Sequence, residues 1–160
     1  MAGSEGLAAR RLVSVGSAAT VSAVERLARA VTNRETVAIF GDYDVDGACS
    51  AALLASFLDA CGVPRLVRIP DRIFEGYGPN AEAVKELRAA GANVLVTVDC
   101  GVTSHEVIAG ARALGLDVIV LDHHQAPERL PDALVVNPNR QDDLSGLGAL
   151  CAAGVVFMTL

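Results

Sequence analysis

The sequence contains no tryptophan, and aromatic residues make up only 4% of its 160 residues. Hydrophobic residues nevertheless account for 52% of the chain, which argues against disorder and is enough for one domain with a full core. With so few aromatic rings, that core must consist mainly of alanine, valine and leucine. The composition therefore favours an α/β interior over a β-sandwich.

The sequence also lacks paired cysteines. Its four cysteines, Cys49, Cys61, Cys100 and Cys151, are scattered along the chain without a C-x-x-C motif. This spacing excludes a disulfide framework and a zinc knuckle. We therefore expect reduced thiols in a cytoplasmic protein.

Long hydrophobic segments are missing as well. No apolar stretch follows Arg10 and Arg11, so we expect no signal peptide. The longest uncharged apolar run, residues 147–160, is too short to cross a bilayer, and we expect no membrane association. This run reaches the last residue without a helix-ending signal. We expect it to form a helix buried on most sides, in a chain that is part of a longer protein.

Finally, basic residues do not outnumber acidic residues in this sequence. The net charge is -6 and the isoelectric point is about 4.9, which argues against a strongly basic clamp for nucleic acid. Two bound divalent cations, however, would offset about four of those negative charges. The acidic balance therefore does not exclude a nucleic-acid substrate.

Three aspartates at alternate positions are the most informative feature that is present. Asp42, Asp44 and Asp46 directly follow the apolar residues 37–40. In extended backbone, alternate residues point to one face, so we expect three carboxylates at the tip of a buried strand. Like charges this close repel one another unless cations compensate them. The pattern therefore predicts a site for divalent metal ions.

Hydrophobic periodicity predicts that strands and helices alternate along the chain. We expect a flexible tail over residues 1–17 and one domain over residues 18–160, without internal repeats. The strands are expected at 36–40, 66–69, 93–98, 117–121 and 134–136, and the helices at 21–31, 48–60, 80–90, 104–114 and after Gly148. This alternation predicts an α/β fold with a doubly wound, mainly parallel sheet and helices on both faces.

Polar residues follow most of these predicted strands. Asp99 follows the third strand, the run Asp122-His123-His124 follows the fourth, and Asn137 follows the fifth. In open α/β sheets, ligands bind at the carboxyl ends of the strands. Carboxylates with one imidazole suit Mn²⁺ or Mg²⁺ better than zinc, and Asp99 on a central strand is placed to bridge two ions. We therefore expect a two-metal site that cleaves phosphate esters.

The aspartate run also matches the opening of an EF-hand calcium loop. In that interpretation Asp42 is the first position and Gly47 the sixth. The twelfth position, which requires a bidentate glutamate, is Leu53, and a strand instead of a helix precedes the loop. We therefore reject a calcium site of this type.

Four ordered motifs resemble the DHH phosphoesterase family, from about residue 18 to the end of the chain. They are the aspartate run at 42–46, Val98-Asp99-Cys100-Gly101, Asp122-His123-His124 and Val136-Asn137-Pro138. Three further segments restrict the resemblance to one branch of this family: residues 69–72 (Ile-Pro-Asp-Arg), residues 75–78 (Glu-Gly-Tyr-Gly) and residues 147–157. They point to the bacterial branch that degrades single-stranded DNA from 5′ to 3′ in DNA repair and recombination.

The resemblance implies a two-metal site with Mn²⁺ or Mg²⁺ and assigns a role to each matching residue. The implied metal ligands are Asp44, Asp46, Asp99 and His123, with Asp42 as a further ligand or ligand-orienting acid. His124 is expected to face the scissile phosphate, with Asp122 orienting an imidazole. The residues expected to contact substrate are Arg72, Asn80 and Asn137.

The resemblance also implies partners and further domains. Single-stranded DNA is the expected substrate, and a helicase or a single-strand-binding protein are expected repair partners. Family members carry another metal-binding aspartate, a DHH-associated domain and, in this branch, an OB-fold, none of which these 160 residues contain. We therefore expect little or no processive exonuclease activity from these residues alone.

Two other functions stay open. The chain could instead be a DHH phosphoesterase that acts on short oligonucleotides, cyclic dinucleotides or pyrophosphate. It could also be a metal- or nucleotide-binding module without turnover. Metal-dependent phosphodiester cleavage distinguishes an enzyme from such a module.

Overall fold

The computed structural model describes residues 18–160, so the expected flexible tail over residues 1–17 lies outside the described part. The helices are α2 (Ala18–Asn33), α3 (Val45–Ala60), α4 (Ala81–Ala89), α5 (His105–Ala113) and α6 (Ala152–Thr159). The strands are β1 (Val37–Gly41), β2 (Arg65–Arg68), β3 (Val94–Val98), β4 (Asp117–Leu121) and β5 (Leu134–Val136). Among the described helices, none is long and apolar enough to cross a membrane.

The strands form one sheet in the order β2-β1-β3-β4-β5, and every pair of neighbours is parallel. The predicted doubly wound α/β fold is confirmed. From β1 the chain proceeds to β2 on one side and later to β3 on the other. The strand order therefore reverses between β1 and β3, and such a reversal opens a crevice at the carboxyl ends of the two strands.

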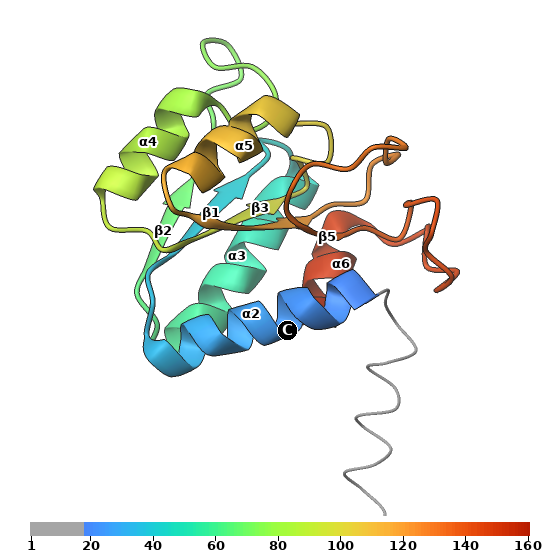
Figure 1. Cartoon of the computed structure of the whole chain (residues 1–160), viewed down its shortest axis with the longest axis horizontal. Helices are drawn as coiled ribbons and strands as arrows, with labels where there is room; N and C mark the ends of the chain where they lie inside the picture. Colours follow the sequence, from blue (N-terminus) through green and yellow to red (C-terminus); the bar gives the residue numbers. More distant parts are fainter. Residues whose placement is uncertain (1–17) are drawn as a thin grey trace, which may run out of the picture.

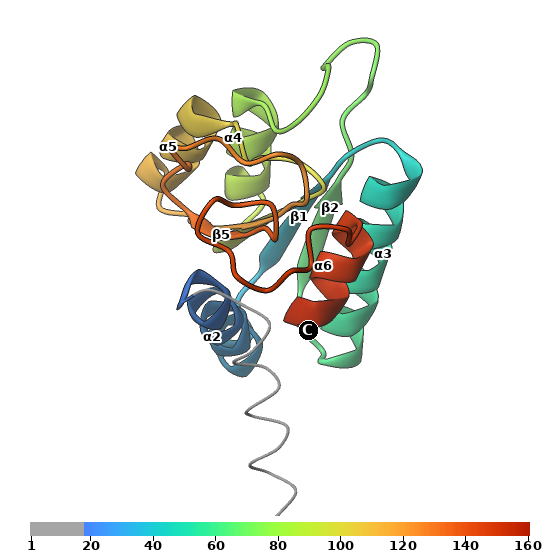
Figure 2. The same cartoon turned by 90° about the vertical axis from the view of Figure 1, so that its right-hand side faces the viewer.

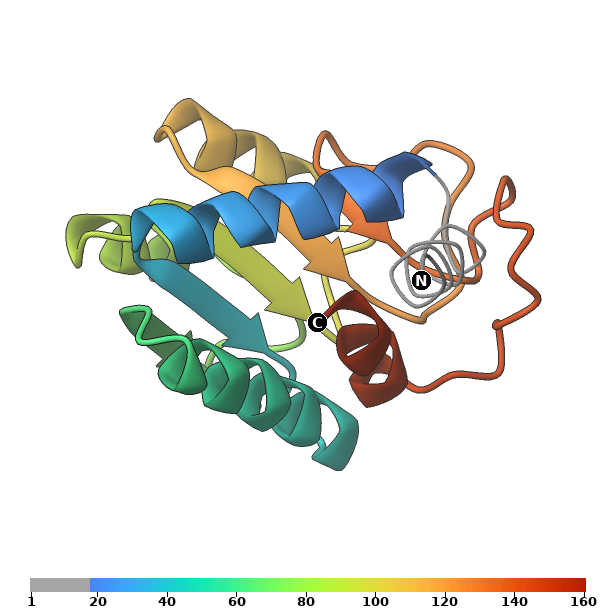
Figure 3. The same cartoon turned by 90° about the horizontal axis from the view of Figure 1, so that it is seen from below.

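Helices cover both faces of the sheet, as expected (Figure 1). On one face, α2, α3 and α6 pack on a core that includes Ile39, Leu54 and Val96. Figure 2 shows α6 alongside α3, and Figure 3 shows α2 crossing the same face. On the other face, α4 and α5 cover a second core around Phe40 and Leu95. Aliphatic residues dominate both cores, as the aromatic-poor composition predicts.

The turn from β1 into α3 differs from the sequence prediction. Helix α3 begins at Val45, three residues before the predicted start, because the side chain of Asp44 caps it by accepting a hydrogen bond from the N–H of Gly47 (2.9 Å). Gly47 lies against the backbone of Asp42, where a Cβ would stand 2.5 Å from the carbonyl oxygen. Asp42 thus follows a strand, Asp44 caps a helix, and Asp46 lies in its first turn. The predicted single face of three aspartates is wrong.

The remaining helix ends differ in how they are capped. Asn80 caps α4 and accepts a hydrogen bond from the N–H of Ala83 (2.8 Å), whereas Ser104 precedes α5 without a capping side-chain bond. Helix α6 buries Val155 and Val156, but its Phe157 is 69% exposed. Phe157 is the only exposed residue within α6, since Ala152, Val155, Val156 and Thr159 are buried and the other three are half-buried. The helix is thus buried on most sides, as expected, except at Phe157.

Leu54 tests the packing of α3 against the sheet. Its side chain is fully buried, so Leu54→Ala removes apolar contacts and leaves a cavity. We expect the free energy of unfolding to fall by about 2–5 kcal/mol in a denaturant titration. Leu144→Ala is the matched control, because Leu144 is 97% exposed and the same truncation there should change stability by less than about 0.5 kcal/mol. Equal effects of the two variants would contradict the observed core.

Candidate metal centre

Four polar residues stand in the first position after four neighbouring strands. The last residues of these strands, Gly41, Val98, Leu121 and Val136, are paired in register across the sheet. The residues that follow them therefore form one row at the carboxyl edge. They are Asp42, Asp99, Asp122 and Asn137, and each is at most 4% exposed.

Asp99 lies at the centre of this row. It is 1% exposed, and its oxygen Oδ1 is buried without a hydrogen-bond partner. Its backbone has a φ of 61°, a left-handed conformation that non-glycine residues seldom adopt. A buried carboxylate oxygen without a donor is unfavourable, as is the backbone strain. Both features are typical of a residue held for a ligand.

Asp122 organises the loop after β4. Its Oδ1 accepts hydrogen bonds from the N–H groups of His123 (2.7 Å) and His124 (3.1 Å), and its Oδ2 accepts one from the N–H of Val102 (3.1 Å). The same Oδ1 lies 2.7 Å from Nδ1 of the His124 ring. Since a carboxylate only accepts, Nδ1 of His124 carries the proton and Nε2 is left for other contacts. Asp122 thus orients an imidazole, as the sequence predicts, although the catalytic role of the pair remains a prediction.

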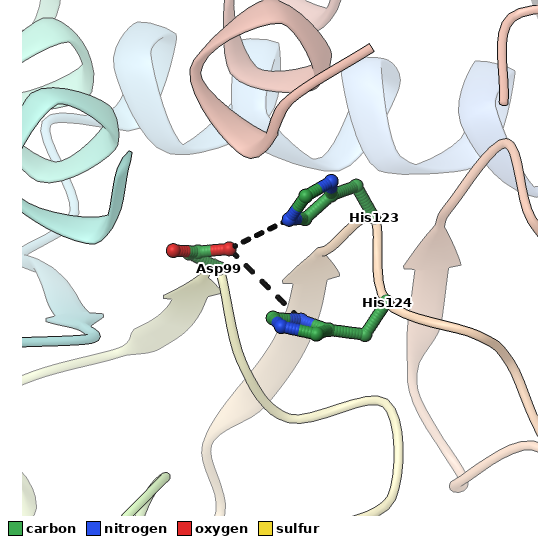
Figure 4. A group of neighbouring side chains, drawn as sticks. All are labelled: Asp99, His123 and His124. Carbon is green, nitrogen blue, oxygen red and sulfur yellow. Dashed lines mark ion pairs between the residues drawn. The ribbon is translucent and has the colours of Figure 1, made fainter. Parts of the chain in front are cut away.

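The ring of His123 faces Asp99. Its Nδ1 lies 3.2 Å from the carbonyl oxygen of Leu150, which can only accept, so this nitrogen carries the proton. Its Nε2 lies 3.2 Å from Oδ1 of Asp99 and 3.6 Å from Oδ2 of Asp46. Figure 4 shows both imidazoles turned toward the Asp99 carboxylate. In the neutral ring, the Nε2 lone pair therefore points at two carboxylates, an arrangement that a cation stabilises.

The candidate ligands form two groups that share Asp99. In one group, Asp99, His123 and His124 offer ligand atoms that all lie within 4.8 Å of one another, although Nδ1 of His124, 3.9 Å from Asp99, is the nitrogen that bonds Asp122. In the other, Asp42, Asp44 and Asp99 do the same. Oδ1 of Asp42 is, like that of Asp99, buried without a partner. This arrangement fits the predicted pair of ions with Asp99 between them, and oxygen with imidazole ligands suits Mn²⁺ or Mg²⁺.

Asp46 lies beside these groups and has further partners. Its Oδ2 accepts a hydrogen bond from the N–H of Ala152 (2.7 Å), and its Oδ1 accepts one from the N–H of Ala153 (2.9 Å). Asp46 therefore reaches the first turn of α6 as well as His123. Its predicted role as a metal ligand stays a prediction.

The pKa values of the site reflect burial and mutual repulsion. Burial, followed by the charges of Asp46 and Asp44, raises the pKa of Asp99 to about 7. Burial also raises the pKa of Asp42. For His124, burial lowers the pKa, but the hydrogen bond and the charge of Asp122 outweigh it, so the net shift is upward. These three shifts favour the protonated form of each group, as expected where carboxylates are buried close together. The pKa of Asp44 is instead lowered, because its carboxylate accepts a hydrogen bond from the N–H of Gly47.

The three predicted substrate residues differ in how free their side chains are. Arg72 is exposed, with its guanidinium 5.1 Å from the centre of the Tyr43 ring. Asn80 caps α4 and also donates to Oε2 of Glu75 (3.0 Å). Asn137 is buried and donates to the carbonyl oxygen of His124 (2.9 Å). Only Arg72 has a side chain open to substrate, and the roles of all three remain predictions.

Two contributors to the site were assigned no role from the sequence. The hydroxyl of Tyr77 donates to the carbonyl oxygen of Asp99 (3.2 Å) and lies 3.3 Å from Nδ1 of His124. The Glu-Gly-Tyr-Gly motif marks Tyr77 but does not reveal this contact. The carbonyl of Leu150, which fixes the His123 ring, carries no sequence signal because it is a backbone group.

Comparisons with known proteins show which family the chain belongs to. Residues 36–160 match the model of the DHH family, N-terminal domain. The single-stranded-DNA-specific exonuclease RecJ of Salmonella typhimurium is 40% identical over 138 residues, which are 85% of this chain and 24% of that protein. RecJ of Bacillus subtilis is 35% identical over 136 residues, which are 84% of this chain and 17% of that protein. The chain thus spans about a quarter or less of the length of these curated relatives.

A solved structure shares the fold as well as the sequence. The crystal structure of exonuclease RecJ bound to manganese has a TM-score of 0.79 and 35% identity, and the match covers 88% of this chain and 36% of that chain. The region matched by the family model contains every described strand and every candidate metal ligand. The chain therefore belongs to the DHH family.

Proposed function

We propose that this chain is the amino-terminal, metal-binding part of a single-strand-specific DNA exonuclease that hydrolyses phosphodiester bonds with two Mn²⁺ or Mg²⁺ ions. The observation that carries the proposal is the buried carboxylate of Asp99, shared by two groups of candidate ligands at the carboxyl ends of β1 and β3, where the strand order reverses. The relatives named single-stranded-DNA-specific exonucleases and the manganese-bound RecJ structure support it.

The residues of the site divide into two sets of proposed roles. Asp42, Asp44, Asp46, Asp99 and His123 would hold the metal ions. Such a pair of ions, when bound, activates water and stabilises charge on the phosphate oxygens. His124, with Nδ1 bound to Asp122, keeps Nε2 free to contact the scissile phosphate or to protonate the leaving oxygen.

The loop between β2 and α4 supports a single-stranded substrate. Figure 2 shows this loop, residues 69–80, extending beyond the sheet. Asp71 and Glu75 brace it, because Oδ1 of Asp71 accepts from the N–H of Ile73 (2.8 Å) and Oε1 of Glu75 accepts from the N–H of Asp71 (2.8 Å). The braced loop presents Arg72 beside Ile73 (84% exposed) and Phe74 (86% exposed). A cation beside an exposed aromatic ring suits a phosphate next to an unstacked base.

The cellular setting belongs to the same proposal. A role in DNA repair and recombination in the cytoplasm, together with a helicase or a single-strand-binding protein, follows from the family resemblance. The relatives reported above are exonucleases, which favours this function over hydrolysis of cyclic dinucleotides or pyrophosphate.

Asp99→Asn tests the metal centre. The amide keeps the shape of the carboxylate but removes the charge that both ligand groups share. We expect the affinity for Mn²⁺, measured by calorimetry, to fall by more than about 100-fold, since loss of a group that only hydrogen-bonds to a metal ligand already costs about 10–100-fold. Mn²⁺-dependent release of nucleotides from 5′-labelled single-stranded DNA should be lost in parallel.

Asp132→Asn is the matched control for this experiment. Asp132 is exposed and pairs with Arg112 at the opposite edge of the sheet, so neither Mn²⁺ affinity nor nucleotide release should change. Mn²⁺ binding without any release by the parent chain would mean that these residues form the metal centre but not a sufficient catalytic site, or that they form a non-catalytic metal-binding module. Absence of Mn²⁺ binding by the parent would contradict the metal centre itself.

The raised pKa of Asp99 predicts how the stability of the metal-free chain depends on pH. An aspartate has a pKa of about 3.9 in the unfolded chain, whereas that of Asp99 in the fold is about 7. Between these values the folded state binds more protons, so stability falls as the pH rises. The upward shifts of Asp42 and His124 act in the same direction.

We therefore expect the metal-free chain to unfold at a lower urea concentration at pH 8 than at pH 5.5. Asp99→Asn should reduce this difference, because the amide does not titrate. Excess Mn²⁺ should reverse the trend, because metal binding requires the deprotonated carboxylate. An unchanged pH dependence in Asp99→Asn would contradict the assignment to this residue.

Arg72→Ala tests the substrate loop. Loss of one phosphate contact should raise the Kd for single-stranded DNA and reduce the slope of log Kd against log salt concentration by about 0.7, without changing Mn²⁺ affinity. Arg29→Ala is the control, since Arg29 is an exposed arginine near the start of β4, at the other edge of the sheet. An equal effect of both variants would show that only the net charge matters.

A further inference from the structure

The segment 150–153, where α6 begins, contacts two of the candidate metal ligands. The N–H groups of Ala152 and Ala153 donate to the two oxygens of Asp46 at 2.7 and 2.9 Å. The carbonyl oxygen of Leu150 lies 3.2 Å from Nδ1 of His123. All of these contacts come from the backbone of a segment more than one hundred positions from Asp46 in the sequence.

The contact with Asp46 completes the start of α6. The first N–H groups of a helix have no partner within the helix, and they carry the positive end of its dipole. The residue at the cap position, Cys151, makes no side-chain capping bond. The carboxylate of Asp46, which belongs to α3, takes that place. Each of its oxygens keeps a second lone pair, so the same carboxylate can cap α6 and still bind a metal ion.

The contact with His123 sets which ring nitrogen is available. Because the carbonyl of Leu150 only accepts, it holds the proton on Nδ1. The unprotonated Nε2 then points at Asp99 and Asp46, at 3.2 and 3.6 Å. Hydrogen bonds of this kind, from the far side of a ligating imidazole, orient the ring and raise its basicity.

We propose that the start of α6 is a positioning element for the metal centre, and that metal binding and the docking of α6 stabilise each other. The proposal rests on the metal centre of the proposed function. It adds that the backbone of α6 holds two of the candidate ligands, Asp46 and His123, in position before a metal ion binds. Coupling of two binding events is reciprocal. A displaced α6 therefore weakens the metal centre, and a bound metal ion holds α6 in place.

Ala152→Pro removes one of these donors without requiring a different backbone conformation, although its ring must be accommodated at a fully buried position. Ala152 is the first residue of α6, a position where proline is tolerated because the N–H has no helical partner. The preceding Cys151 has φ -73° and ψ 167°, the extended conformation that a following proline requires. The proline ring takes the place of the N–H that holds Asp46. We expect the affinity for Mn²⁺ in calorimetry to fall about tenfold or more.

Ala152→Gly is the matched control, because it keeps the N–H and should bind Mn²⁺ with nearly the affinity of the parent. The electron paramagnetic resonance spectrum of bound Mn²⁺ should change in Ala152→Pro and not in Ala152→Gly. A purely structural role of α6 does not alter that spectrum. Equal Mn²⁺ affinity and equal spectra in the two variants would overturn the inference and leave the proposed metal centre intact.

Amide hydrogen exchange tests the capping contact without any metal. In the metal-free chain, Asp46→Ala should speed exchange at Ala152 and Ala153 by about tenfold or more. Asp42→Ala removes a carboxylate of the same centre that, among the described residues, makes no hydrogen bond to α6, and it should leave those two amides unchanged. Unchanged exchange in Asp46→Ala would overturn the capping contact.

The two experiments separate the inference from the function on which it rests. A parent chain that binds no Mn²⁺ overturns the proposed function and the coupling, whatever the exchange measurement gives. A parent chain that binds Mn²⁺ should also show slower exchange at Ala152 and Ala153 when Mn²⁺ is added. Faster exchange on adding Mn²⁺ would show that the metal and α6 compete for Asp46, and it would overturn the coupling.

Discussion

The central constraint on this structure is that the carboxylate of Asp99 is buried in the interior, close to other carboxylates. Burial raises the free energy of the charged form, and the neighbouring Asp44 and Asp46 raise it further, so the pKa of Asp99 reaches about 7. Its Oδ1 has no hydrogen-bond partner, and its backbone adopts a strained conformation. These costs are offset by the rest of the fold, because β3 is a buried central strand that fixes where the residue stands.

The surroundings of this carboxylate are built largely from backbone groups. Asp122 is held by three N–H groups and in turn fixes the ring of His124. His123 is oriented by a carbonyl, and Asp46 by two N–H groups of α6. Backbone donors and acceptors move little once the elements are packed. A site supported in this way keeps its geometry with little reorganisation when charge develops in a reaction.

The position of the site follows from the topology of the sheet. Parallel strands place all of their carboxyl ends at one edge, and the reversal of strand order between β1 and β3 separates the connections that leave them. The residues after β1, β3, β4 and β5 are therefore side by side although they are far apart in the sequence. The match to the DHH family over residues 36–160 covers this whole edge.

The sequence by itself determined the fold class, the strands and the edge that carries the polar residues, because these follow from local hydrophobic periodicity and from the rule that parallel strands end together. The placement of Asp99 and Asp122 at this edge could be predicted because each directly follows a buried strand, and His123 comes one residue after Asp122. Only the tertiary structure decided the directions of Asp44 and Asp46, because the start of α3 depends on a capping bond and on close packing around Gly47. Contacts made by backbone groups of distant segments, such as the start of α6, cannot be predicted from residue types, because every residue carries the same backbone groups. Only the three-dimensional structure shows them.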